Sequence, residues 1–131
     1  MGRTLKLERK KQPLAIVRLE ATEPIPDWAV AQQSEFFSIT RTNDELSIVC
    51  DVRLVPTDVT AERDWVALKI AGPLAFDEVG IIATLATTLQ RACVPIFVVS
   101  TYDTDYVLIR NVDMDTAAEA LERAGHTVRW K

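Results

Sequence analysis

The sequence predicts an α+β protein made of two tandem halves, each with an antiparallel sheet and helices on one face. Two observations predict this architecture: a β-hairpin pattern that occurs twice, and a β-α-β-β-α-β order of elements in the second half. The composition agrees, because 48% of the 131 residues are hydrophobic and 26% are charged, as in globular proteins. We expect residues 1–62 to form a degenerate first half and residues 63–131 a complete second half.

The repeat is visible when residues 36–49 are written over residues 96–109 without a gap, an offset of 60 residues. In this alignment Ile39 meets Val99. Each copy reads as a strand, a polar turn and a second strand, which predicts a β-hairpin in each half.

A shorter echo precedes each hairpin. Residues 14–19 resemble residues 66–71 at an offset of 52 residues, which predicts a strand before each hairpin. Between this strand and the hairpin the first half has only residues 24–30, with Pro26 suited to an early helical position. We therefore expect a short helical turn there, and a further first-half strand at residues 4–8.

The second half has a full helical pattern at the corresponding place, because its apolar residues recur at helical spacing. Asp113 is expected to cap a second helix, and Gly125 to end it in a left-handed conformation. The predicted elements are a strand at 65–71, a helix at 79–93, the hairpin at 96–109, a helix at 114–124 and a strand at 127–130. This order predicts a ferredoxin-like unit with two helices on one face of the sheet.

Charge and hydropathy exclude several classes of partner. The net charge of -4 removes the attraction that binding to a phosphate backbone needs. No apolar stretch reaches the roughly 20 residues of a membrane helix, and no signal-peptide pattern is present. We expect a cytoplasmic protein that binds neither nucleic acid nor membrane, with Cys50 and Cys93 as small buried residues.

Five segments together resemble the compact bacterial tandem ACT-domain proteins, and are similar to the ACT repeats of the animal cytosolic arginine sensor. They are residues 37–42, 44–50, 72–76, 79–83 and 100–108, and the likeness spans about residues 13–126. The resemblance implies a non-catalytic regulatory module, because ACT domains pair their sheets side by side and bind amino acids at the junction. With no enzyme attached, we expect the output to pass through a second copy of the chain, in a homodimer, or through a regulated enzyme or other protein.

A small amino-acid-like ligand needs N–H donors for its carboxylate and acidic or carbonyl oxygens for its ammonium group. The start of the first predicted helix offers unpaired N–H groups, and Gly80 would allow close approach. The resemblance implies that the backbone of residues 79–81 holds the ligand's α-groups and that residues 100–105 set side-chain preference. The candidate ligand-binding residues are Phe76, Asp77, Val79, Gly80, Ile81, Ser100, Thr101, Tyr102, Asp103 and Asp105.

Other interpretations of these residues stay open. Asp77 is also a plausible helix N-cap, Asp103 and Asp105 are also ordinary turn residues, and Ile81 is core in either case. Tyr102 stands where relatives would be expected to have Phe.

Catalysis is not expected, and neither is a cofactor or a metal. The only histidine, His126, directly follows the helix stop, where capping or solvation is the commoner role. The sequence has no nucleophile elbow, phosphate-binding glycine loop or metal-ligand spacing. The alternative function is a ligand-free protein–protein interaction or oligomerisation module, in which Trp28, Trp65 and Trp130 would mark contact surface.

Overall fold

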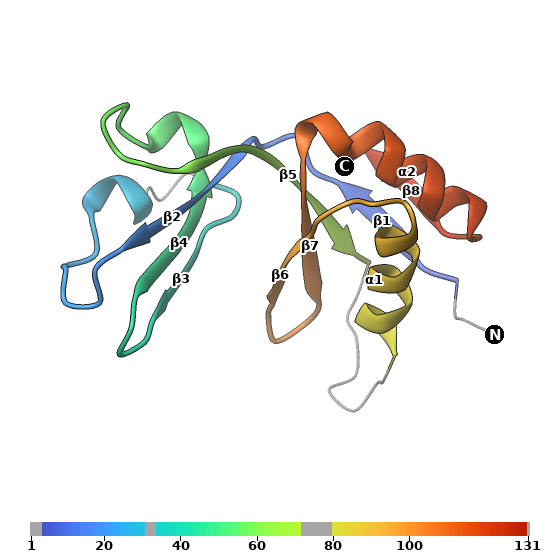
Figure 1. The fold of residues 1–131 in the computed structure, drawn as a ribbon, viewed down its shortest axis with the longest axis horizontal. Coiled ribbons are helices and arrows are strands. Elements are labelled where there is room, and N and C mark those ends of the chain that lie inside the picture. The colour runs from blue at the N-terminus through green and yellow to red at the C-terminus, as the bar shows by residue number, and fades with distance from the viewer. Residues whose placement is uncertain (1–3, 31–33, 72–79, 131) are drawn as a thin grey trace. The chain divides into compact units, whose positions relative to one another are not determined.

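The computed structural model describes residues 4–30, 34–71 and 80–130. The chain divides into two compact units (Figure 1). We call residues Gln12–Trp65 the N-terminal unit, and Met1–Lys11 together with Val66–Lys131 the C-terminal unit.

The C-terminal unit contains an open sheet with two helices on one face (Figure 1). Its elements are β1 (Lys6–Arg9), the second part of β5 (Glu62–Ile70), α1 (Ile81–Arg91), β6 (Phe97–Ser100), β7 (Asp105–Arg110), the 3-10 turn η3 (Asn111–Asp113), α2 (Met114–Arg123) and β8 (Thr127–Trp130). Strand β7 pairs with β5 and β6, whereas β1 pairs with β5 and β8. The predicted α+β class, with two helices on one face of a ferredoxin-like sheet, is confirmed.

The core of this unit follows from two periodicities. Alternate residues of a strand share one face of the sheet, so the helices cover Val66, Leu68 and Ile70 of β5 and Val107 and Ile109 of β7. The helices contribute residues at three- and four-residue spacing, namely Ile81, Leu85 and Leu89 of α1 and Met114, Ala117 and Leu121 of α2. Each fully buried Leu or Ile side chain contributes about 1.5–3 kcal/mol to stability.

Strand β1 differs from the prediction, which assigned residues 4–8 to the first half. Strand β1 pairs antiparallel to β5 and parallel to β8. The physical reason is its alternation, since Leu5 and Leu7 are buried in the core of the C-terminal unit. A strand inserted between two antiparallel neighbours must be parallel to one of them, so the sheet is mixed and not purely antiparallel as predicted.

The ends of α2 confirm one predicted signal and contradict another. Gly125 has φ 98°, and the N–H groups of Gly125 and His126 donate to the carbonyls of Glu122 and Leu121, which is a Schellman motif. Asp113 makes no side-chain cap among the described residues. Its carboxylate instead accepts a hydrogen bond from Arg110 Nε (3.0 Å), because residues 111–113 already form a 3-10 turn that leads into the helix.

The N-terminal unit is a sheet accompanied by short 3-10 turns in place of full helices. Its elements are β2 (Leu14–Leu19), the 3-10 turn η1 (Asp27–Val30), β3 (Ser38–Arg41), β4 (Leu46–Asp51), the 3-10 turn η2 (Val52–Leu54) and the first part of β5, in the strand order β3-β4-β2-β5. The predicted short helical turn is confirmed as η1. The buried core is Ala15, Val17, Ala29, Leu46, Ile48, Cys50 and Val55.

The two hairpins repeat, but one residue out of the predicted register. Ile39 pairs with Ile48 and Val98 pairs with Val107, and both Ile48 and Val107 are core residues. Ile39 therefore corresponds to Val98 and not to Val99, an offset of 59 residues. The leading strands are also out of the predicted register, because an offset of 52 places the core residue Val17 over Lys69, whereas the core residues of β5 are Val66, Leu68 and Ile70. A slip of one residue moves every side chain to the opposite face of a sheet.

Candidate functional site

The β6–β7 hairpin is tied to the end of β5. Thr104 Oγ1 donates a hydrogen bond to the backbone carbonyl of Ile70 (2.7 Å), and the Thr104 residue is only 5% exposed. Ile70 is the last residue of β5, so the hairpin turn lies at the end of the sheet from which the chain continues toward α1 (Figure 1). This bond fixes the turn of the hairpin against the end of β5.

The turn itself is held by Thr101. The backbone N–H of Thr101 donates to the Thr104 carbonyl (2.8 Å), and Thr101 Oγ1 donates to the same carbonyl (3.1 Å) and accepts from Thr104 N–H (3.3 Å). This is an ST-type turn, in which the hydroxyl satisfies the local backbone. The Thr101 hydroxyl is therefore largely engaged within the turn.

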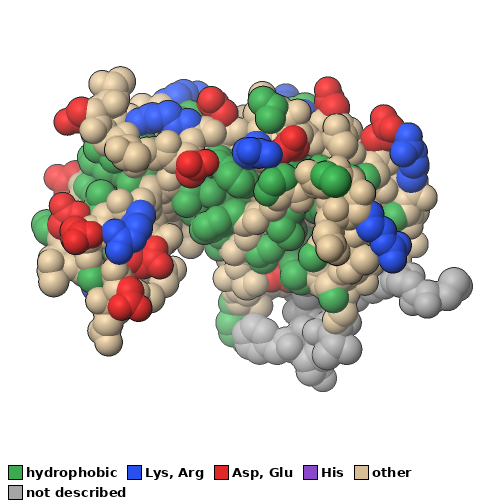
Figure 2. Space-filling view, in the orientation of Figure 1, with side chains coloured by type: hydrophobic (Ala, Val, Ile, Leu, Met, Phe, Trp, Pro, Cys, Tyr) green, Lys and Arg blue, Asp and Glu red, His purple; other side chains and the backbone are tan. Residues whose placement is uncertain are grey.

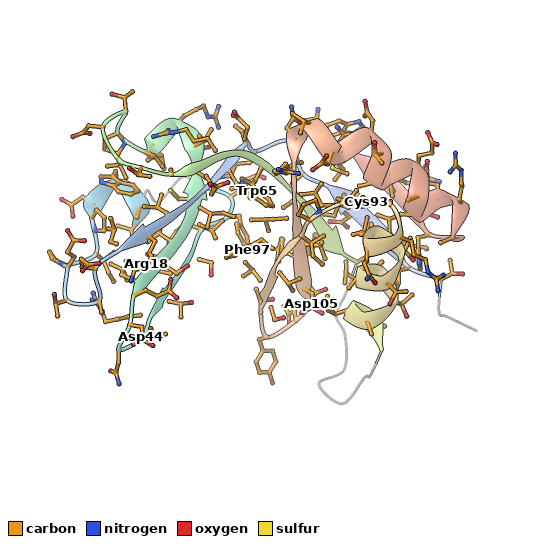
Figure 3. All side chains as sticks on the ribbon, viewed as in Figure 1. Arg18, Asp44, Trp65, Cys93, Phe97 and Asp105 are labelled. Carbon is orange, nitrogen blue, oxygen red and sulfur yellow. The ribbon has the colours of Figure 1, made fainter. Side chains whose placement is uncertain are left out.

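Ser100 and Asp105 form a polar pair at the base of the hairpin. They are directly opposite in the β6–β7 register, and Ser100 Oγ donates to Asp105 Oδ1. Their position relative to Val107 places both on the sheet face that α1 covers. Figure 3 shows Asp105 at the hairpin end of β7. With Oδ1 engaged by the hydroxyl, Oδ2 remains an acceptor for a cationic group.

The tip of the hairpin is exposed. Tyr102 is 80% exposed, and Asp103 beside it is also an exposed residue. Both residues are therefore open to solvent at the hairpin tip.

Helix α1 begins at Gly80, which has the left-handed conformation φ 85°, ψ −4°. Its carbonyl accepts the first intrahelical bond, from Thr84 N–H (2.9 Å), and a Cβ built on Gly80 would have no atom of the described residues within 4 Å. The described residues provide no side-chain cap for this helix. First-turn N–H groups of a helix carry positive partial charge and favour anions such as a carboxylate.

The remaining predicted residues divide into two groups. Ile81 is 7% exposed and its side chain packs in the core, so only its backbone could reach a ligand. Phe76, Asp77 and Val79 lie outside the described residues. Sequence reasoning missed Thr104, whose signal is weak: a β-branched residue between two acidic turn residues, one position before a strand.

Cysteine and histidine chemistry lies elsewhere in the fold. Cys50 is buried as predicted, and burial, with a smaller effect of Asp51, raises the pKa of its thiol to about 11. Cys93 is exposed, which contradicts the prediction. Its φ of 60° belongs to the turn that ends α1, and this turn directs the side chain to the surface.

His126 is buried and not solvated, and its backbone N–H takes part in the C-cap of α2, which is one of the two expected roles. Its Nδ1 accepts a hydrogen bond from the backbone N–H of Leu5 (3.0 Å), and burial lowers the pKa of the imidazole. The nitrogen that accepts this bond must be unprotonated, so the neutral ring carries its proton on Nε2. His126 thus joins the strand β1 segment to the end of α2.

The described ranges hold neither a metal-ligand cluster nor a membrane-spanning helix. In residues 4–30, 34–71 and 80–130, no group of three or more His, Cys, Asp or Glu side chains could hold a metal ion. Over the same residues, none of the helices has the length and apolar character needed to cross a membrane.

The fold of the C-terminal unit is that of an ACT domain. A family model described as "ACT domain" matches residues 60–123, and a second model, described as an N-terminal domain, matches residues 13–58. The chain belongs to the ACT-domain family.

Three comparisons place it among known proteins. Protein Atu0741 from Agobacterium tumefaciens, a crystal structure, shares 42% identity and a TM-score of 0.91, over 99% of this chain and 96% of that one. The human "Cytosolic arginine sensor for mTORC1 subunit 1" is 30% identical over 96 residues, 67% of this chain; the chain spans only 29% of that relative. The aspartate kinase of Clostridium acetobutylicum shares the fold, with a TM-score of 0.66 at 14% identity, over 92% of this chain and 34% of the kinase.

Proposed function

We propose that the chain is a non-catalytic cytoplasmic regulatory protein that binds a small amino-acid-like ligand and signals through ligand-dependent contacts. The site is the end of the C-terminal unit where the β6–β7 hairpin and the start of α1 lie together. The observation that carries the proposal is the Ser100–Asp105 pair, which places a carboxylate on the face of the sheet that α1 covers.

The chemistry of an amino acid matches the two parts of this end. The ammonium group would bind Asp105, with Asp103 adding negative charge at the hairpin tip, because charge-assisted hydrogen bonds are the strong ones. The carboxylate would accept N–H groups at the start of α1, where Gly80 leaves open space. Thr104 would hold the two parts in place without touching the ligand.

The relatives support the same proposal. One of them carries the name of an arginine sensor, and the fold also occurs in an aspartate kinase described as an allosteric enzyme. The output of this chain would then be a change in its contacts with a second copy or with a regulated protein. The fold alone does not define a ligand, because one fold hosts many sites.

A thermal-shift screen against the twenty amino acids and common nucleotides tests the proposal. A ligand at a hundredfold excess over its Kd adds about 2.7 kcal/mol to stability, which raises the Tm by about 10 °C in a chain of this size. We expect one amino acid to give this shift, and Asp105→Asn to abolish it.

Asp44→Asn is the matched control for Asp103→Asn, because these residues occupy equivalent turn positions in the two hairpins. The control should keep the shift, whereas Asp103→Asn should reduce it. A cooperative melt that no amino acid shifts would contradict the proposal and favour a ligand-free interaction module.

A further inference from the structure

The segment between β2 and β3 combines exposed apolar side chains with an excess of acidic ones. Two arginines of the neighbouring strands contact it, Arg18 at the Glu20 carboxylate and Arg41 at the Ala21 carbonyl. Residues 20–37 contain four acidic residues, Glu20, Glu23, Asp27 and Glu35, and no Lys or Arg. Three large hydrophobic residues here are exposed: Ile25 at 45%, Val30 at 39% and Phe37 at 40%. Exposed apolar side chains grouped together, unlike scattered ones, are characteristic of interaction sites.

These side chains lie in or beside elements that pack on the core of the N-terminal unit. Turn η1 packs on the core through Ala29, which is fully buried, and Trp28 and Ile39 are partly buried against the same core. Phe37 directly precedes edge strand β3. Val30 is the last residue of η1, and Ile25 lies two residues before its first residue. We call Ile25, Val30, Phe37, Glu23, Asp27 and Glu35 the η1 surface.

The internal repeat shows what this face lacks. In the C-terminal unit the corresponding face of the sheet carries α1 and α2, with eleven and ten residues. In the N-terminal unit the described residues supply only the short turns η1 and η2, with four and three residues. An amphipathic helix added beside η1 would therefore cover apolar side chains that the chain's own elements leave exposed.

The charges specify the polar side of such a helix. Glu20 is paired with Arg18 (3.0 Å). Among the described residues, Glu23, Asp27 and Glu35 form no ion pair, and all three are exposed. Figure 2 shows Asp and Glu side chains over the N-terminal unit, together with hydrophobic side chains and some Lys or Arg. Complementary charge on a partner accelerates association and rejects acidic competitors.

We propose that the η1 surface docks a basic amphipathic helix of a partner protein. The apolar face of that helix packs on Ile25, Val30 and Phe37, and its Lys or Arg residues face Glu23, Asp27 and Glu35. This mode is the helix-in-groove type of recognition, in which apolar residues at helical spacing anchor the helix. It concerns the N-terminal unit and does not depend on the ligand site of the C-terminal unit.

The test uses two synthetic peptides of about five helical turns. Both carry the same Leu face; one has Lys on its polar face and the other has Glu. The full chain is labelled with 5-fluorotryptophan and followed by fluorine NMR, where Trp28 reports on the η1 surface and Trp130, in the C-terminal unit, serves as the internal reference. We expect the Lys peptide to shift the Trp28 resonance in a saturable way and the Glu peptide to have no effect.

Variants locate the binding. We expect each of two variants to weaken binding of the Lys peptide by about tenfold or more: Phe37→Ser, and the double variant Glu23→Lys with Asp27→Lys. The matched controls are Val112→Ser and Asp115→Lys, which change an exposed apolar residue and an exposed acidic residue of the C-terminal unit and should leave the Kd unchanged.

Three outcomes would overturn the proposal. Equal binding of the two peptides would show that charge does not select the occupant. A Kd unchanged by Phe37→Ser, in a variant with a native circular dichroism spectrum, would place binding elsewhere. Self-association of the wild-type chain in sedimentation experiments that Phe37→Ser abolishes would assign the surface to a second copy.

Discussion

Thr104 is joined to Ile70 by a buried hydrogen bond, from the threonine hydroxyl to the last carbonyl of strand β5 (2.7 Å). The bond connects residues 34 positions apart and fixes the hairpin turn at the end of the sheet where α1 begins. The candidate ligand site depends on this connection, because Asp105 directly follows Thr104.

Thr104→Val should destabilise the C-terminal unit with almost no change in side-chain volume. Valine has nearly the same shape, but it leaves the buried carbonyl of Ile70 without its partner, which costs about 1–3 kcal/mol. Urea unfolding measures the loss. Thr116→Val on α2 is the control, because Thr116 is exposed. Equal stability of Thr104→Val and the wild type would show that the bond is replaced by water.

His126 should make stability depend on pH near neutrality. The folded pKa is lower than the ordinary value of 6.5, so the unfolded chain binds the proton more readily. The stability that neutral His126 contributes to the folded state is therefore fully present above about pH 6.5 and decreases as the pH falls toward the folded pKa. Unfolding free energies from about pH 8 to about pH 5 measure the slope. His126→Gln should remove it, and an unchanged slope in that variant would assign it to other groups.

Asp51 should make stability depend on pH in a lower range than His126 does. The Arg53 side chain donates to Asp51 from Nε (2.9 Å) and Nη2 (2.5 Å), and this hydrogen bonding lowers the pKa of the carboxyl group. The stability it contributes is present above its unfolded pKa of about 3.9 and is lost as the pH falls through the lower folded value. Carbon-13 NMR titration of the carboxyl group measures that pKa directly. In Arg53→Met the pKa should rise toward 3.9; a pKa that stays low would mean that Gln12 and the backbone suffice.

The sequence predicted the elements better than their partners. Helical spacing identified α1 and α2 because amphipathic helices carry their pattern locally. The partner of β1 could not be read in the same way, since a short strand with Leu5 and Leu7 alternating fits any sheet edge. Its pairing depends on residues more than 50 positions away.

The register of the repeat is a second feature that could not be predicted from the sequence. An alignment offset of 60 matched residue types well, with Phe37 over Phe97, but the core-facing pairs Ile39–Ile48 and Val98–Val107 require 59. Similar apolar residues occur on both faces of these strands, so the composition of the segment could not decide the register. In the candidate site, Ser100 and Asp105 were found from their polarity, whereas the anchoring role of Thr104 requires the tertiary contact.

Gly80→Ala should destabilise the chain although nothing would contact the new methyl group. The residue has φ 85°, and an L side chain in the left-handed region costs about 1–2 kcal/mol. Gly80→Asn should cost less, because asparagine tolerates this conformation. Denaturation of the two variants in urea gives the comparison. If Ala and Asn cost the same, steric contact and not backbone strain would be the cause.

The two thiols should differ strongly in reactivity. Cys93 is exposed, whereas Cys50 is buried and its pKa is raised to about 11, so at neutral pH almost none of it is the reactive thiolate. Ellman's reagent should therefore modify one thiol per native chain at once and the second only on unfolding. Cys93→Ser should remove the fast phase and leave the slow one. A fast phase that survives in Cys93→Ser would mean that Cys50 becomes accessible by local opening of the N-terminal unit, and the rate would then measure the free energy of that opening.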